Sequence, residues 1–168
     1  IHGCLVGSEM CIRDRSCAQV MKDKEEIIRT ALKYVPQESR FFIRSKICLD
    51  EILRASDWED GYKKINNILN EYGHCRIYQE VGMMINSFLF ANNIYEGICI
   101  QVSQGADTDS FGASVGSLLG SYYGPEGLDS KWLEIFNDDI HTGMAWFFER
   151  SVSKLAKRMG RLPINFSK

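Results

Sequence analysis

The sequence predicts an all-α protein, built as a helical bundle around one central, mostly buried helix. Between residues 17 and 159, apolar side chains recur every three or four positions, the spacing that places them on one side of a helix. Proline, glycine and aspartate stand between these segments, where helices begin and end. The one segment whose β-branched residues permit a strand, 94–104, has no hairpin partner nearby.

The first three predicted helices follow from apolar faces and their stop signals. Residues 18–35 place their apolar side chains on one broad face, and Pro36 ends the pattern. Residues 38–55 likewise place their apolar side chains on one face. Asp57 then stands where an N-cap belongs and predicts a third helix over 58–72.

Residues 74–91 are apolar nearly all round, which predicts the buried central helix. Residues 94–104 predict a shorter helix. An acidic turn and a glycine-rich helix ending near Gly124 come next. The last predicted helices cover 131–136 and roughly 139–159.

Composition excludes several classes of protein. The chain has 168 residues, enough for one domain with a core, and its net charge of -2 gives no electrostatic footprint for nucleic acid. Its six cysteines include no CxxC pair, so neither a zinc ribbon nor a redox motif is predicted. The apolar runs are too short to span a membrane. We expect a cytoplasmic protein with no nucleic-acid or membrane partner.

The N-terminal stretch differs from the rest. Residues 1–16 begin without Met and show no helical or strand periodicity. They resemble translated adaptor sequence, and the alternative is a disordered leader. Both interpretations place the boundary of the helical domain at residue 17, so the domain is predicted to span 17–168.

The most informative segment is the acidic turn. Asp107 and Asp109 stand two residues apart, where their charges repel, and Ser110 adds a hydroxyl. Three hard oxygen donors this close suit Mg²⁺, Mn²⁺ or Ca²⁺. An EF-hand loop is excluded, because Phe111 stands at its fifth position and Leu118 stands where a bidentate Glu is required.

Helix capping is the alternative interpretation of the same side chains, since all three could be stabilised at a helix N-terminus. Capping does not explain the glycines that follow at every fourth position. Such a stripe predicts that another backbone approaches the helix closely. Its members are Gly112, Gly116, Gly120 and Gly124.

The sequence "GADTDSFGASVGSLLGSYYG", residues 105–124, resembles the C-terminal metal signature of the ADP-ribosylglycohydrolases. Two upstream segments support the resemblance. "ALKYVPQESR" is similar to the family's segment before a long helix, and "GHCRIYQEVGMMINSFLFANN" is similar to its His-containing helix. The resemblance covers about residues 18–160 and implies an all-α bundle of that family's type.

The resemblance implies a hydrolase that cleaves the glycosidic bond between ADP-ribose and a protein side chain or a small conjugate. It implies two Mg²⁺ ions, with Mn²⁺ as an alternative, that orient the ribose and position a water. Asp107, Asp109 and Ser110 would be metal ligands, Asp109 bridging the ions, and both aspartates would be catalytic. His74 and Gly105 would contact substrate, although a structural role for His74 is an open alternative. The complete protein would be monomeric.

One departure from the family bears on activity. Its members are longer and carry further ligands in an N-terminal Thr-Asp-Asp-Thr motif that this sequence lacks. We therefore expect a C-terminal part, truncated at the N-terminus and inactive alone. Apolar faces should then be exposed, among them Val81, Met84, Phe88 and Leu89. The alternative is a non-catalytic, crystallin-like structural or binding relative.

Overall fold

A computed structural model describes residues 22–73, 76–141, 146 and 148–161. The predictions for residues 1–16 and for His74 lie outside these ranges. The chain divides into two compact units, residues 1–128 and 129–168, which are described separately. Every regular element in the described ranges is a helix, so the all-α prediction is confirmed. None of these helices has the length and apolarity to cross a membrane.

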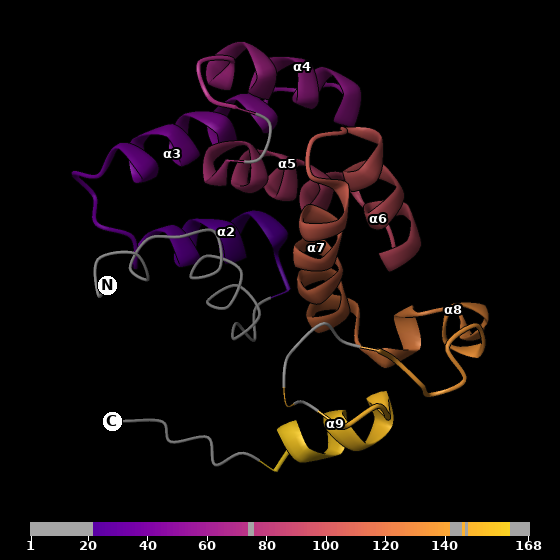
Figure 1. The fold of residues 1–168 in the computed structure, drawn as a ribbon. Coiled ribbons are helices and arrows are strands. Elements are labelled where there is room, and N and C mark those ends of the chain that lie inside the picture. The colour runs from indigo at the N-terminus through magenta and orange to yellow at the C-terminus, as the bar shows by residue number, and fades with distance from the viewer. Residues whose placement is uncertain (1–21, 74–75, 142–145, 147, 162–168) are drawn as a thin grey trace. The chain divides into compact units, whose positions relative to one another are not determined.

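The helices of the first unit agree with the predicted segments and have somewhat shorter bounds (Figure 1). Residues 94–104, whose composition permitted a strand, are helical. In chain order the elements are α2 (Lys24–Leu32), α3 (Arg40–Ile52), α4 (Trp58–Leu69), α5 (Ile77–Phe90), α6 (Ile94–Ser103), α7 (Thr108–Tyr123) and the 3₁₀ turn η2 (Pro125–Gly127).

Four of these helices begin at a polar side chain that caps them. Asp23, Ser39, Asp57 and Asn93 precede α2, α3, α4 and α6, and each accepts a hydrogen bond from the backbone N–H three residues later. Each cap satisfies a donor that the first turn would otherwise leave without a partner. The predicted cap at Asp57 is confirmed.

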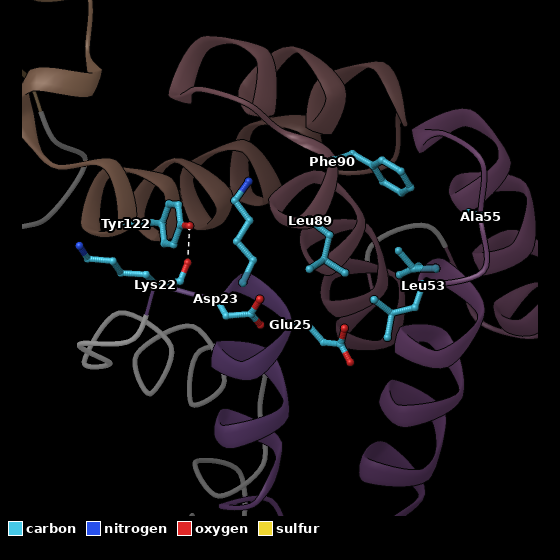
Figure 2. A pocket seen from close by; sticks show the side chains of 10 residues that line it. Lys22, Asp23, Glu25, Leu53, Ala55, Leu89, Phe90 and Tyr122 are labelled. Carbon is cyan, nitrogen blue, oxygen red and sulfur yellow. Dashed lines mark hydrogen bonds between the residues drawn. The ribbon is translucent and has the colours of Figure 1, made fainter.

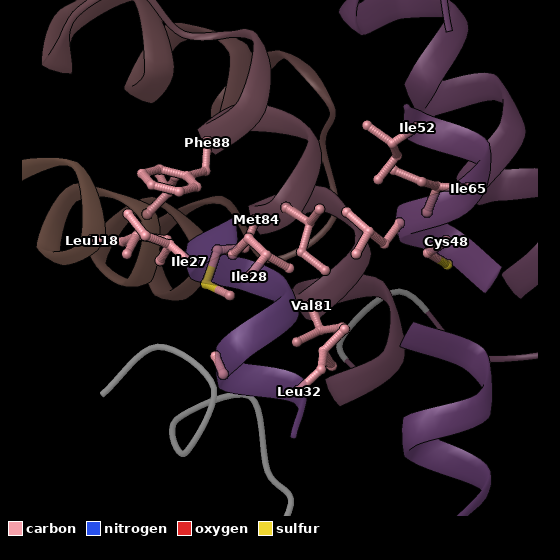
Figure 3. Close-up of a cluster of buried hydrophobic side chains, with 14 of the residues drawn as sticks. Ile27, Ile28, Leu32, Cys48, Ile52, Ile65, Val81, Met84, Phe88 and Leu118 are labelled. Atoms are coloured by element: carbon pink, nitrogen blue, oxygen red, sulfur yellow. The ribbon is translucent and has the colours of Figure 1, made fainter. Parts of the chain in front are cut away.

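Helix α5 lies at the centre of the first unit, as predicted. It contacts α2, α3, α4, α6 and α7, and Figure 3 shows side chains from α2, α3, α4 and α7 meeting those of α5. Val81, Met84 and Phe88 are at most 1% exposed. The expectation that these three are exposed is wrong, because helices of this chain itself cover them; only Leu89 is partly exposed.

Apolar side chains are exposed elsewhere on the unit, singly or in pairs. The larger ones that lie on its helices are Ile43 and Ile47 of α3 and Tyr95 and Val102 of α6.

Among the described residues, no other backbone packs against the glycine stripe of α7. A Cβ atom at Gly112 would lie 3.8 Å from the Val102 side chain, and one at Gly116 would lie 3.9 Å from Ile98. Both distances are ordinary van der Waals contacts, and a Cβ at Gly120 would meet no atom of the described residues within 4 Å. Within the described part of the chain, the predicted close approach is therefore wrong for these glycines.

Close packing occurs at glycines of other helices. A Cβ at Gly97 of α6 would lie 2.3 Å from the Leu119 side chain of α7. One at Gly61 of α4 would lie 2.1 Å from Oδ1 of Asn86 on α5. Bare backbone at these two positions lets α6 and α4 approach their neighbours.

The second unit contains α8 (Ser130–Glu134) and α9 (Val152–Met159). Of the described residues in the helix predicted over 139–159, only 152–159 are helical. Asn137 and Asp138 have positive φ values of 45° and 57°. The Asp138 carboxylate accepts hydrogen bonds from the Ser153 backbone N–H at 2.7 Å and from the Ser151 hydroxyl at 2.5 Å. Asp138 therefore caps the start of α9.

The contrast between glycines gives a stability prediction. Gly120→Ala should raise the free energy of unfolding by about 0.5–1 kcal/mol, because alanine favours a helix and the position is open. Gly97→Ala should lower it by about 1–3 kcal/mol through overpacking against Leu119. Urea unfolding followed by circular dichroism measures both. A destabilised Gly120→Ala variant would mean that a neighbour occupies the stripe in solution.

Candidate functional site

The acidic turn joins α6 to α7 through two residues with left-handed backbone. Gly105 has φ of 79° and Ala106 has φ of 62°. Glycine adopts this conformation freely, whereas a residue with a Cβ loses about 1–2 kcal/mol there. Such strain persists only where the surrounding structure imposes it, and it concentrates at functional sites.

Asp107 stands at the N-cap position of α7 but does not cap the helix. Its side chain makes no well-formed capping hydrogen bond to the first turn, and only the more weakly placed hydroxyl and N–H of Ser110 lower its pKa. This distinguishes Asp107 from Asp23, Ser39, Asp57 and Asn93, which all cap their helices. Well-formed capping therefore does not account for this carboxylate, which faces Asp109.

The carboxyl groups of Asp107 and Asp109 face each other. Their hydrogen bond raises the pKa of Asp107, partial burial raises it further, and the hydroxyl and N–H of Ser110 oppose the rise. The same hydrogen bond lowers the pKa of Asp109, with help from the backbone N–H groups of Ser110 and of Asp109 itself. The opposite shifts reflect the mutual repulsion of two neighbouring carboxylates. A cation at that place would relieve the same repulsion.

The donor set fits a hard divalent cation. Asp107, Asp109 and Ser110 bring two carboxylates and a hydroxyl together within one helical turn, all on the partly or fully exposed side of α7. Mg²⁺ and Mn²⁺ prefer such oxygen ligands. No group of three or more His, Cys, Asp or Glu side chains suited to a metal occurs in the described ranges. The turn therefore offers a partial coordination sphere.

The structure describes only one of the two residues predicted to contact substrate. Gly105 lies within the turn, and a Cβ there would meet nothing within 4 Å, so the backbone at this point is open. His74 lies outside the described residues. Both contacts stay predictions.

Polar side chains of α5, of α7 and at the end of α6 also surround the turn. The sequence analysis did not single them out. Ser114 of α7 donates to Oε1 of Glu80 on α5 at 2.8 Å. Gln104, the last residue before the turn, is 2% exposed and bonds to α5 through its side chain. The available signal was the presence of amide and hydroxyl side chains in segments that are otherwise apolar.

A surface cavity of about 430 Å³ lies elsewhere (Figure 2). Tyr122 of α7 lines it, together with Leu53 directly after α3 and the end of α5. Tyr122 stands 14 residues after Thr108 in the same helix, about 21 Å away at 1.5 Å per residue. The cavity and the acidic turn are therefore at opposite ends of α7.

Lys24 lies beside this cavity and joins α2 to α5 and α7. Its ammonium group is 5.5 Å from the ring centroid of Phe88 and 5.4 Å from those of Tyr122 and Tyr123. It also donates to the Ala91 carbonyl. Burial lowers its pKa, and the charge of Glu96 opposes this shift. These contacts explain Lys24 as a structural link.

Comparison with known protein families identifies one family description, ADP-ribosylglycohydrolase, which matches residues 1–161. The match covers nearly the whole chain and confirms the family resemblance read from the acidic turn. Neither the curated proteins nor the solved structures include a match.

The strained turn gives a second stability prediction. Ala106→Gly should stabilise the protein by about 0.5 kcal/mol, because relief of left-handed strain exceeds the added freedom of the unfolded chain. Ala113→Gly, in the same helix-turn segment but with helical backbone, should destabilise it by about 0.5–1 kcal/mol. Thermal unfolding of both variants measures the difference. Equal losses would show that Ala106 is not strained in solution.

Proposed function

The chain belongs to the ADP-ribosylglycohydrolase family, and on that premise we propose a metal-dependent hydrolase activity for this protein. The reaction is cleavage of the glycosidic bond between ADP-ribose and an acceptor, either a protein side chain or a small conjugate. The oxygen of a water molecule forms a bond to the anomeric carbon as the bond to the acceptor breaks. One proton of that water stays on the new hydroxyl group, and the acceptor takes the other. The observation that carries the proposal is the uncapped Asp107 carboxylate facing Asp109.

Asp107, Asp109 and Ser110 would hold Mg²⁺ through their oxygen atoms, with Mn²⁺ as an alternative and Asp109 between two ions. A bound ion supplies charge neutralisation and fixes the ribose hydroxyls and a water relative to the scissile bond. The three side chains of one turn cannot fill the octahedral spheres of two ions, so other residues or water would supply the remaining ligands. We therefore assign the turn to one side of a dinuclear site and expect the isolated chain to be a poor catalyst.

Electrostatics favour a cation in this role. ADP-ribose carries a negatively charged diphosphate, which two adjacent carboxylates would repel. Asp109 and Ser110 are exposed, and Asp107 is partly exposed. A cation on these oxygens would reverse the local charge and attract the ligand. The exposed face of α7 beyond Asp109 carries only small side chains, among them Ala113 and Ser117, which leaves room for a ribose.

Metal binding is the first test. Asp109→Asn should weaken Mn²⁺ affinity by at least about tenfold, because ligand charge tunes the affinity of oxygen sites. The matched control is Glu59→Gln, since Glu59 is also an exposed acid at the second position of a helix, α4. This control should leave the affinity within about twofold. Electron paramagnetic resonance of free Mn²⁺ measures both, and equal affinities would contradict the assignment.

Ligand binding separates the hydrolase from its structural alternative. ADP-ribose should raise the Tm of the chain in the presence of Mg²⁺ and leave it unchanged in EDTA. A chain that binds Mn²⁺ but ignores ADP-ribose under both conditions would favour the non-catalytic relative.

A further inference from the structure

The side chain of Gln104 is buried at the place where α6 ends and the acidic turn begins. It is 2% exposed and stands three residues before Asp107. Its Oε1 accepts a hydrogen bond from Asn86 Nδ2 at 3.0 Å. Its Nε2 donates to the Ser87 hydroxyl at 2.7 Å and to the Met83 carbonyl at 3.3 Å. All of these partners are on α5.

Asn86 extends this network to a third helix. It is fully buried, and its Nδ2 also donates to the Trp58 carbonyl at the start of α4, at 2.9 Å. Gly61 of α4 leaves the space that the Asn86 side chain fills. The network therefore joins α4, α5 and α6 at one point, directly before the turn.

The chain after the turn is held by the same helix. Ser114 donates to Glu80 of α5, and Phe111, one helical turn after Asp107, is 2% exposed. Glu80, Met83 and Ser87 are three to four residues apart and so lie on one side of α5. This side of α5 contacts both the last residue before the turn and the first turns of α7.

Local structure alone does not fix the carboxylates. Asp107 lacks a well-formed capping hydrogen bond, and the preceding Ala106 has a left-handed backbone that costs free energy. The position of the turn must then come from anchors at its two ends. We propose that Gln104 is a positioning residue for the acidic turn: its buried amide, bound to α5, holds Asp107 and Asp109 in the geometry that binds a divalent cation. This inference rests on the proposed metal-dependent function.

Gln101 provides a matched control for Gln104. It is also on α6, is fully buried, and bonds to the same Ser87 hydroxyl through its Oε1 at 2.9 Å. It lies six residues before Asp107, and within the described residues its side chain makes no hydrogen bond to the turn. Methionine at either position keeps the volume and removes the amide. In Gln104→Met, Asn86 retains Trp58 and Ser87 retains Gln101 as partners.

The experiment compares Mn²⁺ affinity of the wild-type chain, Gln104→Met and Gln101→Met at a temperature where circular dichroism shows all three folded. Gln104→Met should bind Mn²⁺ about tenfold more weakly, the lower end of the effect of groups that support metal ligands. Gln101→Met should stay within about twofold of wild type, although it also loses a buried hydrogen bond to Ser87. Equal affinities, or equal losses in both variants, would overturn the inference.

A second measurement is independent of the metal. Hydrogen exchange of the backbone amides of residues 105–110 should accelerate about tenfold in Gln104→Met and stay unchanged in Gln101→Met, relative to the other amides of α7. If the turn exchanges equally in both variants, Gln104 does not position it. If the wild-type chain fails to bind Mn²⁺ while exchange follows the expected pattern, the proposed function fails and the positioning role of Gln104 for the turn stands.

Discussion

The burial of α5 among α2, α3, α4, α6 and α7 is the constraint on which the rest of the first unit depends. A helix covered on so many sides cannot leave polar side chains without partners, because their desolvation would not be offset. Asn86 meets this requirement through its Nδ2, which donates to α4 and to Gln104, whereas its Oδ1 has no hydrogen-bond partner among the described residues. Ser87 meets it by bonding to α6, and these bonds tie the end of α6, where the acidic turn starts, to α5.

The turn combines two local losses of stability. Ala106 adopts a conformation that its Cβ disfavours, and the neighbouring carboxylates of Asp107 and Asp109 repel each other. Neither loss is offset by capping, although four other helices of the unit are capped by residues of the same kinds. Folding alone would favour a glycine and a single capping aspartate here. A cation that binds both carboxylates accounts for the residues that are present.

The features that could be predicted from the sequence are those that depend on neighbours along the chain. The helices, the cap at Asp57 and the acidic turn follow from local patterns. The features that could not be predicted depend on distant partners. Gly120 and Gly97 are both helical glycines, yet only Gly97 faces a packed side chain of another helix. Residues 139–141 likewise leave the helical pattern, because Asp138 binds groups near residue 152 that lie far along the chain.

The exposure of the site limits the chemistry that the described part of the chain supplies by itself. Exposed carboxylates such as Asp109 stay charged without a large desolvation cost, which suits the capture of a cation from solution. Exposure also keeps the local dielectric constant high, so electrostatic stabilisation of a transition state is weak there. Efficient cleavage of a glycosidic bond would therefore require further residues that cover the turn and exclude water. Gln104 and Glu80 position the turn from beneath, through α5, and leave its outer side open to receive such a cover.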